Sequence, residues 1–82
     1  MLDEKTRELI AIGAAITANC QPCLEYHTTK ARELGVDNED ILEAVKVGQQ
    51  VRRGASAKMD RFAAQQVSDQ NEAVAPAGCE CS

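Results

Sequence analysis

A chain of 82 residues makes one small domain, and its 44% of hydrophobic residues argues against a disordered protein. The net charge of -4, with nine basic residues scattered among thirteen acids, argues against a nucleic-acid partner. No signal-peptide pattern opens the sequence, and the longest apolar run, residues 9–16, is too short to cross a bilayer. We therefore expect a cytoplasmic protein with no membrane partner.

Aromatic residues are almost absent, since Tyr26 and Phe62 are the only two. The core must then be built from Ala, Val, Ile and Leu, which is typical of helices packed on helices. We predict an all-α fold of about three to four helices over residues 1–67.

Residues 4–18 form the first predicted helix, because Asp3 is a suitable N-cap and only Gly13 interrupts the helix-forming residues that follow. The second half of this helix, LIAIGAAITA, is apolar or small on nearly every face. One companion pair of helices in so small a domain could not cover all of it. We therefore expect a homo-oligomer that assembles through its helices.

The second predicted helix covers residues 21–34. Pro22 suits its first turn, where the missing N–H of proline leaves no hydrogen bond unmade. Gly35 is well placed to end it in the left-handed conformation.

The third predicted helix begins near Asn38, with Asp37 as its N-cap. Apolar residues at helical spacing continue as far as Ala63, and the segment VRRGASAKMDRFAAQQV carries the predicted helix to residue 67. Gly54 interrupts this pattern and predicts a bend or a short break.

The last residues, 68–82, lose the helical periodicity and read SDQNEAVAPAGCECS. We predict a mobile tail here. Its Cys79 and Cys81 could be a second dithiol, a pair of soft-metal ligands or part of an unstructured end.

The chemistry-bearing motif is TANCQPCLEYHTTK, where Cys20, Cys23 and the single His27 have the spacing C-x-x-C-x-x-x-H. These three residues share one stripe of a helix if the helix includes Cys20. A cysteine at the start of a helix lies near free N–H groups and the positive end of the helix dipole, which favour a thiolate. His27 follows Cys23 by one turn and could take its proton.

Three other interpretations compete with a redox pair. The thiols and the histidine could simply fill a helix face. A zinc site could use Cys20, Cys23 and His27 with Cys79 or Cys81 as fourth ligand, although structural zinc sites usually draw two ligand pairs from separate turns. Covalent haem is disfavoured, because that attachment needs His directly after the second cysteine, where this chain has Leu24.

The segment ELIAIGAAITANCQPCLEYH resembles the alkylhydroperoxidase D-like (AhpD-like) branch of the carboxymuconolactone decarboxylase family. The motif of that branch is Glu, eleven residues, Cys, two residues, Cys, three residues, His. Glu8, Cys20, Cys23 and His27 match all four positions. The resemblance runs over about residues 2–66.

This resemblance implies an all-helical trimer or hexamer in which the second cysteine attacks peroxide and the first resolves the product. It also implies that Glu8 and His27 form a proton relay, whereas Glu8 taken alone reads as a first-turn helix acid facing water. The decarboxylase members of the family lack the cysteine pair. The chain is also shorter than the two-repeat peroxidases, and the C-terminal CECS is not part of the motif.

We therefore expect a thiol-dependent peroxidase or disulfide oxidoreductase, with peroxiredoxin activity, that needs no bound cofactor and uses an unknown thiol reductant. Cys23 is the expected nucleophile because it is four residues from His27, although position in the helix favours Cys20. The rival hypothesis is a metal-binding or redox-sensor module. Of the remaining polar residues, Glu25 reads as solvated. Arg52 and Arg53 read as surface charges, although an arginine near a peroxide site could steer an anionic partner.

Overall fold

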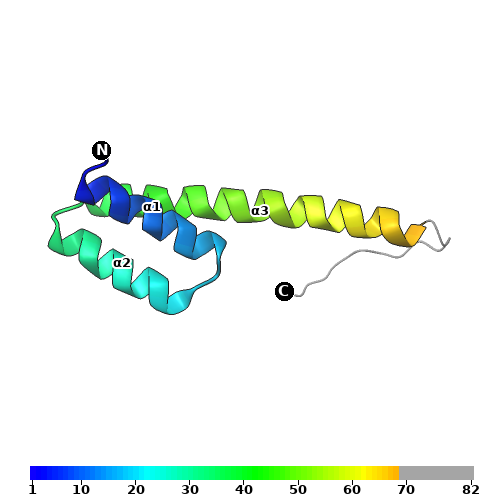
Figure 1. The fold of residues 1–82 in the computed structure, drawn as a ribbon, viewed down its shortest axis with the longest axis horizontal. Helices are drawn as coiled ribbons and strands as arrows, with labels where there is room; N and C mark the ends of the chain where they lie inside the picture. The colour runs from blue at the N-terminus through cyan, green and yellow to red at the C-terminus, as the bar shows by residue number, and fades with distance from the viewer. Residues whose placement is uncertain (69–82) are drawn as a thin grey trace.

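The computed structural model describes residues 1–68, which fold into three α-helices with no strand among them. These are α1 (Glu4–Thr17), α2 (Gln21–Glu33) and α3 (Asn38–Ser68). Helix α1 packs against both α2 and α3, whereas α2 touches α3 at only a few positions. Figure 1 shows that α1 and α2 lie beside the first half of α3 and that its second half extends beyond them. The predicted all-α fold is confirmed.

The core is small and contains no aromatic side chain within the described part of the chain. Aliphatic residues from all three helices and the turn before α3 make it, and they are packed against partly buried leucine, alanine and valine side chains. The buried hydrophobic residues are Ile12, Ala15, Ala31, Val36 and Ile41.

The helix ends follow from local hydrogen bonding. The Asp3 carboxylate accepts a hydrogen bond of 2.8 Å from the Thr6 backbone N–H and caps α1. Helix α2 stops after Glu33, and Gly35 takes the left-handed conformation with φ of 86°. The helix starts and ends therefore lie within about one residue of the predicted ones.

Helix α3 is continuous through Gly54, so the predicted bend or short break at this residue is wrong. A single glycine in a helix is less favourable than alanine by only about 1 kcal/mol, and its neighbours are good helix formers. Nothing lies within 4 Å of the position that a Cβ atom of Gly54 would take. All residues from 53 to 68 are exposed.

Helices α1 and α3 approach most closely at Gly13 and Gly48. A Cβ atom on Gly48 would lie 2.5 Å from the Gly13 carbonyl oxygen and 2.9 Å from Ile16 Cβ. The Thr17 hydroxyl lies 3.0 Å from the Gly13 carbonyl oxygen and 3.2 Å from that of Gly48. This crossing brings the next turn of α3, which carries Arg52, to the end of α1.

Two further predictions concern the C-terminal tail and a membrane-spanning segment. The predicted tail, with Cys79 and Cys81, lies outside the described residues except for Ser68, which is the last residue of α3. Within residues 1–68, no helix is both long enough and apolar enough to cross a bilayer.

Candidate active site at the start of helix α2

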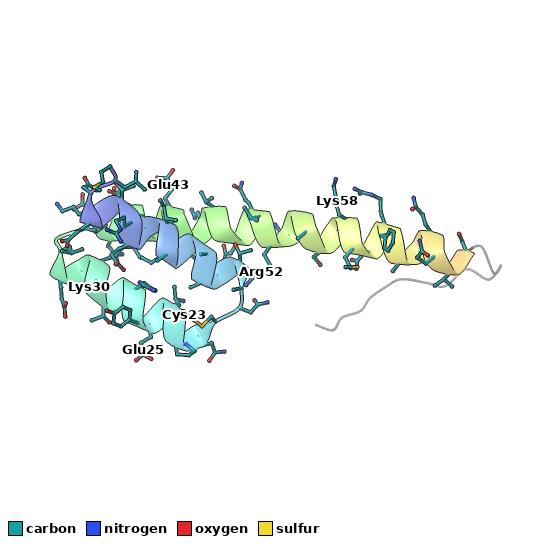
Figure 2. All side chains as sticks on the ribbon, viewed as in Figure 1. Cys23, Glu25, Lys30, Glu43, Arg52 and Lys58 are labelled. Atoms are coloured by element: carbon teal, nitrogen blue, oxygen red, sulfur yellow. A yellow bond between two sulfur atoms is a disulfide. The ribbon has the colours of Figure 1, made fainter. Side chains whose placement is uncertain are left out.

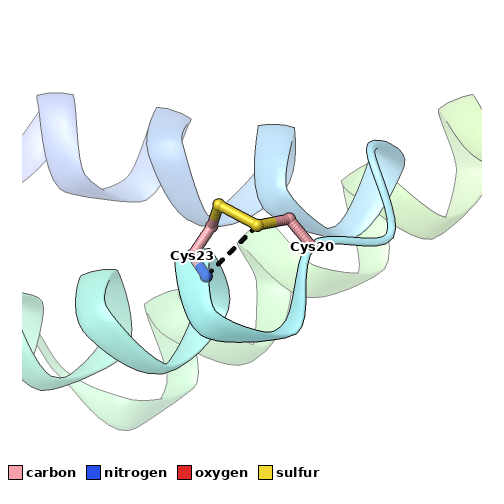
Figure 3. The surroundings of a disulfide bond; sticks show 2 residues. All are labelled: Cys20 and Cys23. Carbon is pink, nitrogen blue, oxygen red and sulfur yellow. Dashed lines mark hydrogen bonds between the residues drawn. A yellow bond between two sulfur atoms is a disulfide. The ribbon is translucent and has the colours of Figure 1, made fainter.

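Cys20 and Cys23 form a disulfide at the beginning of α2, with their Cα atoms 5.3 Å apart (Figure 3). Cys20 is the N-cap of α2 and has extended backbone angles, φ of -104° and ψ of 100°. Its sulfur accepts a hydrogen bond of 3.3 Å from the backbone N–H of Cys23. Cys20 therefore precedes the helix, and only Cys23 and His27 share a helical stripe.

A tight reversal of the chain places this disulfide beside α1. Asn19 has a φ of 57°, a left-handed conformation that asparagine tolerates better than most residues. The backbone N–H groups of Asn19 and Cys20 donate to the carbonyl oxygens of Ile16 and Ala15, at 3.1 and 3.0 Å. The start of α2 is thus held against the end of α1.

His27 and Glu8 meet across the α1–α2 interface. His27 Nδ1 lies 2.7 Å from Glu8 Oε1, and the two side chains are 29% and 17% exposed. Glu8 lies in the second turn of α1, so its reading as a first-turn acid facing water is wrong. In a neutral imidazole, a carboxylate acceptor at this distance places the proton on Nδ1 and leaves the lone pair on Nε2.

The disulfide and His27 line one open pocket with a volume of about 240 Å³. Its other lining residues are small, which leaves room for a ligand beside the sulfur atoms. They are the α1 and turn residues Ala11, Ala14, Ala15 and Ala18. Glu8 does not line this pocket, and its contact with the site is through His27.

The two cysteines differ in accessibility. Cys23 is exposed, whereas Cys20 is partly buried. Tyr26 is 60% exposed, and its ring meets that of His27 edge to face with centroids 4.9 Å apart. Glu25 and Arg53 are exposed, as expected for solvated residues.

Sequence reasoning missed the structural contacts of Arg52. Its Nη1 donates to the Ile16 carbonyl oxygen at 3.0 Å and to Asn19 Oδ1 at 2.8 Å. Arg52 and Cys20 also line a second pocket of about 190 Å³. In Figure 2, Arg52 and Cys23 lie at the same end of the three-helix region, where α1 leads into α2. No signal in the sequence pointed to these contacts, because they depend on where α3 crosses α1.

No group of three or more His, Cys, Asp or Glu side chains among residues 1–68 is arranged to hold a metal ion. The zinc hypothesis drew its fourth ligand from Cys79 or Cys81, which lie outside the described residues.

The helical domain, with its Cys-x-x-Cys disulfide beside a Glu–His pair, is the arrangement that the motif of the AhpD-like branch predicted. The chain belongs to the carboxymuconolactone decarboxylase family, which matches residues 1–66, and within it to the AhpD-like type. The predicted family is confirmed.

Two relatives are themselves without an assigned activity. Uncharacterized protein 4 in cox locus of Paracoccus denitrificans is 42% identical over 55 residues, which cover 67% of this chain and 50% of the relative. An uncharacterized protein of Haemophilus influenzae is 48% identical over 31 residues, which cover 38% of this chain and 27% of the relative. The chain thus spans about half the length of the first relative and about a quarter of the second. No solved structure gives a significant match.

Proposed function

We propose that this protein is a thiol-dependent peroxidase, or more broadly a disulfide oxidoreductase, that cycles Cys20 and Cys23 between dithiol and disulfide. The observation that carries this proposal is the convergence of the disulfide and His27 on one pocket, with Glu8 hydrogen-bonded to the far side of His27. The disulfide corresponds to the oxidised state of the cycle.

In the first step, the Cys23 thiolate attacks the O–O bond of the peroxide. Cys23 is the exposed cysteine and lies one helical turn before His27, whose Nε2 is available to accept the thiol proton. The proton then passes to the leaving oxygen, which departs as water or an alcohol. Cys23 is left as a sulfenic acid.

In the second step, the Cys20 thiol attacks the sulfenic sulfur. The S–S bond forms, and the sulfenic oxygen leaves as water. Cys20 suits this role because its place as the N-cap of α2 brings its sulfur within bonding distance of Cys23. Two thiol equivalents from a reductant then restore the dithiol.

The proposal is tested by adding peroxide to the reduced full chain. One equivalent should be consumed per chain, with loss of two thiols and formation of the Cys20–Cys23 disulfide by peptide mapping. Added dithiol should then support continued consumption. A chain that consumes no peroxide, or whose oxidation leaves Cys20 and Cys23 as thiols, would contradict the proposal.

A redox sensor is the second candidate, because an accessible disulfide beside a histidine serves a switch as well as an enzyme. The two functions differ in turnover. With dithiol and peroxide both in excess, a sensor is oxidised once and stays oxidised. A peroxidase consumes many equivalents of peroxide per chain under the same conditions. Metal analysis of untagged protein would test the metal-binding form of this alternative.

A further inference from the structure

The two pockets at the disulfide differ in chemistry. The pocket lined by His27 is bounded by alanines, and both cysteines reach it. The second pocket is reached by Cys20 and not by Cys23, and it carries polar groups from Asn19, Gln21 and Arg52. Cys20 therefore lies between the two, with a histidine on one side and an arginine on the other.

The positive charge of Arg52 is not balanced by an acid in the described part of the chain. Its two hydrogen-bond acceptors, the Ile16 carbonyl and the Asn19 amide oxygen, are both neutral, and no salt bridge within residues 1–68 includes it. Both hydrogen bonds use Nη1, so the N–H groups on Nη2 and Nε keep their capacity to donate. Guanidinium groups bind carboxylates well, often through two parallel hydrogen bonds.

We propose that the pocket lined by Arg52 binds the carboxylate of an anionic thiol reductant and directs its sulfur to Cys20. This inference rests on the proposed redox cycle of Cys20 and Cys23. The reductant belongs to the class of small thiols, or thiol-bearing segments, that carry a carboxylate a few bonds from the sulfur. The apolar lining from Ile16 and Leu24 then contacts the carbon chain between the two groups.

The reduction balances with two thiols. The thiolate of the first reductant attacks Cys20 Sγ, the Cys20–Cys23 bond breaks, and Cys23 leaves as a thiolate. That leaving group lies in the first turn of α2, near the positive end of the helix dipole, which favours a thiolate. A second reductant thiolate attacks the reductant sulfur of the mixed disulfide, which releases Cys20 as a thiolate and the oxidised reductant as its disulfide.

The test measures single-turnover reduction of the oxidised full chain by 3-mercaptopropionate, which is anionic, and by 2-mercaptoethanol, which is neutral. Rates are compared at equal thiolate concentration, and quenched samples are alkylated and mapped by mass spectrometry. In the wild-type chain, the anionic thiol should react faster, and its mixed disulfide should be on Cys20. Raising the salt concentration should lower the preference.

Arg52→Gln should lower the ratio of the two rates about fivefold, the size expected for losing one charge pair at contact distance in water. Arg53→Gln removes the same charge from the adjacent, exposed residue and should leave the ratio unchanged. Arg52→Lys keeps the charge and should keep most of the preference, with circular dichroism checking that each variant stays helical.

The inference would be overturned if Arg52→Gln slowed reduction by both thiols equally. It would also be overturned if Arg53→Gln lowered the ratio of the two rates as much, or if the mixed disulfide formed on Cys23. None of these measurements uses peroxide. Failure of the peroxidase proposal and failure of the Arg52 inference can therefore be told apart.

Discussion

At the scale of single residues, the hydrogen bond between Glu8 and His27 determines what the histidine can do. Glu8 accepts from Nδ1, so Nε2 remains as a proton acceptor one turn from Cys23. The spacing of Cys20, Cys23 and His27 could be read from the sequence, because all three lie within eight residues. Glu8 was found only through the family motif, since its partner is 19 residues away.

We predict that His27→Gln lowers the rate of Cys23 oxidation by peroxide by about a hundredfold or more at neutral pH, the usual contribution of a general base. The loss should shrink at alkaline pH, where the thiolate forms without help. Stopped-flow peroxide consumption across pH measures both effects. Glu25→Gln, an exposed change on the same helix, is the control. A loss in His27→Gln that stays constant with pH would contradict a role in removing the thiol proton.

We predict that Glu8→Ala slows the same reaction about ten- to a hundredfold, the size expected for losing one hydrogen bond to a charged group. Glu8→Gln keeps an acceptor for Nδ1 and should lose less. The order of the two rates is the test. Equal losses would mean that the charge of Glu8 matters and its hydrogen bond does not.

At the scale of the helices, the ends were predictable from sequence because capping is local, as at Asp3 and Gly35. The behaviour of glycines inside a helix was less predictable. Gly48 and Gly54 are both helical glycines of α3, yet one lies against α1 and the other has no neighbour within 4 Å. The sequence does not distinguish them, because the difference comes from the crossing of two helices. The contacts of Arg52 were missed for the same reason.

We predict opposite effects of alanine at these two glycines. Gly48→Ala should lower the free energy of unfolding by about 1–3 kcal/mol, because its Cβ would lie 2.5 Å from the Gly13 carbonyl oxygen. Gly54→Ala should raise it by about 0.5–1 kcal/mol through helix propensity alone. Urea unfolding followed by circular dichroism measures both. A stabilised Gly48→Ala chain would contradict the close helix crossing.

The cap of α1 gives a pH-dependent prediction. The hydrogen bond from the Thr6 backbone N–H lowers the pKa of Asp3 below its ordinary value of 3.8. The ionised cap therefore contributes its full stability above that value and loses it as the pH falls through the lowered pKa. Asp3→Ala should be less stable than the wild type at pH 7, with a difference that shrinks in acid.

Asp3→Asn keeps a capping oxygen and removes the titration. Its stability relative to Asp3→Ala should not change with pH. Thermal unfolding at a series of pH values tests this pair. A wild-type advantage over Asp3→Ala that persists unchanged well below the ordinary pKa would contradict the cap.

At the scale of the whole molecule, much apolar surface is left uncovered. An apolar groove of about 470 Å³ runs between α1 and α3, and the exposed side chains of Ile10, Val47 and Val51 line it. Farther along α3, Met59 and Phe62 are 63% and 56% exposed. The sequence predicted this excess from the apolar LIAIGAAITA segment, although it could not say that the second half of α3 would also be exposed.

We predict that the chain is a trimer or hexamer that covers this surface with further copies. Val47→Lys places a charge in the groove and should shift the assembly toward smaller species in light scattering. Gln50→Lys adds the same charge at an exposed polar position of α3 and should not. A wild-type monomer at micromolar concentration would contradict the prediction.

The central claim is that Cys23 attacks the peroxide and that Cys20 resolves the sulfenic acid. Replacing each of these cysteines in turn by serine tests it most directly. Each variant is made with Cys79 and Cys81 changed to Ser, so that no other thiol reacts, and is titrated with peroxide under dimedone trapping. Cys20→Ser should consume one equivalent and trap a sulfenic acid on Cys23, whereas Cys23→Ser should remain unreactive. A sulfenic acid on Cys20 in Cys23→Ser, together with an inert Cys20→Ser, would contradict the account.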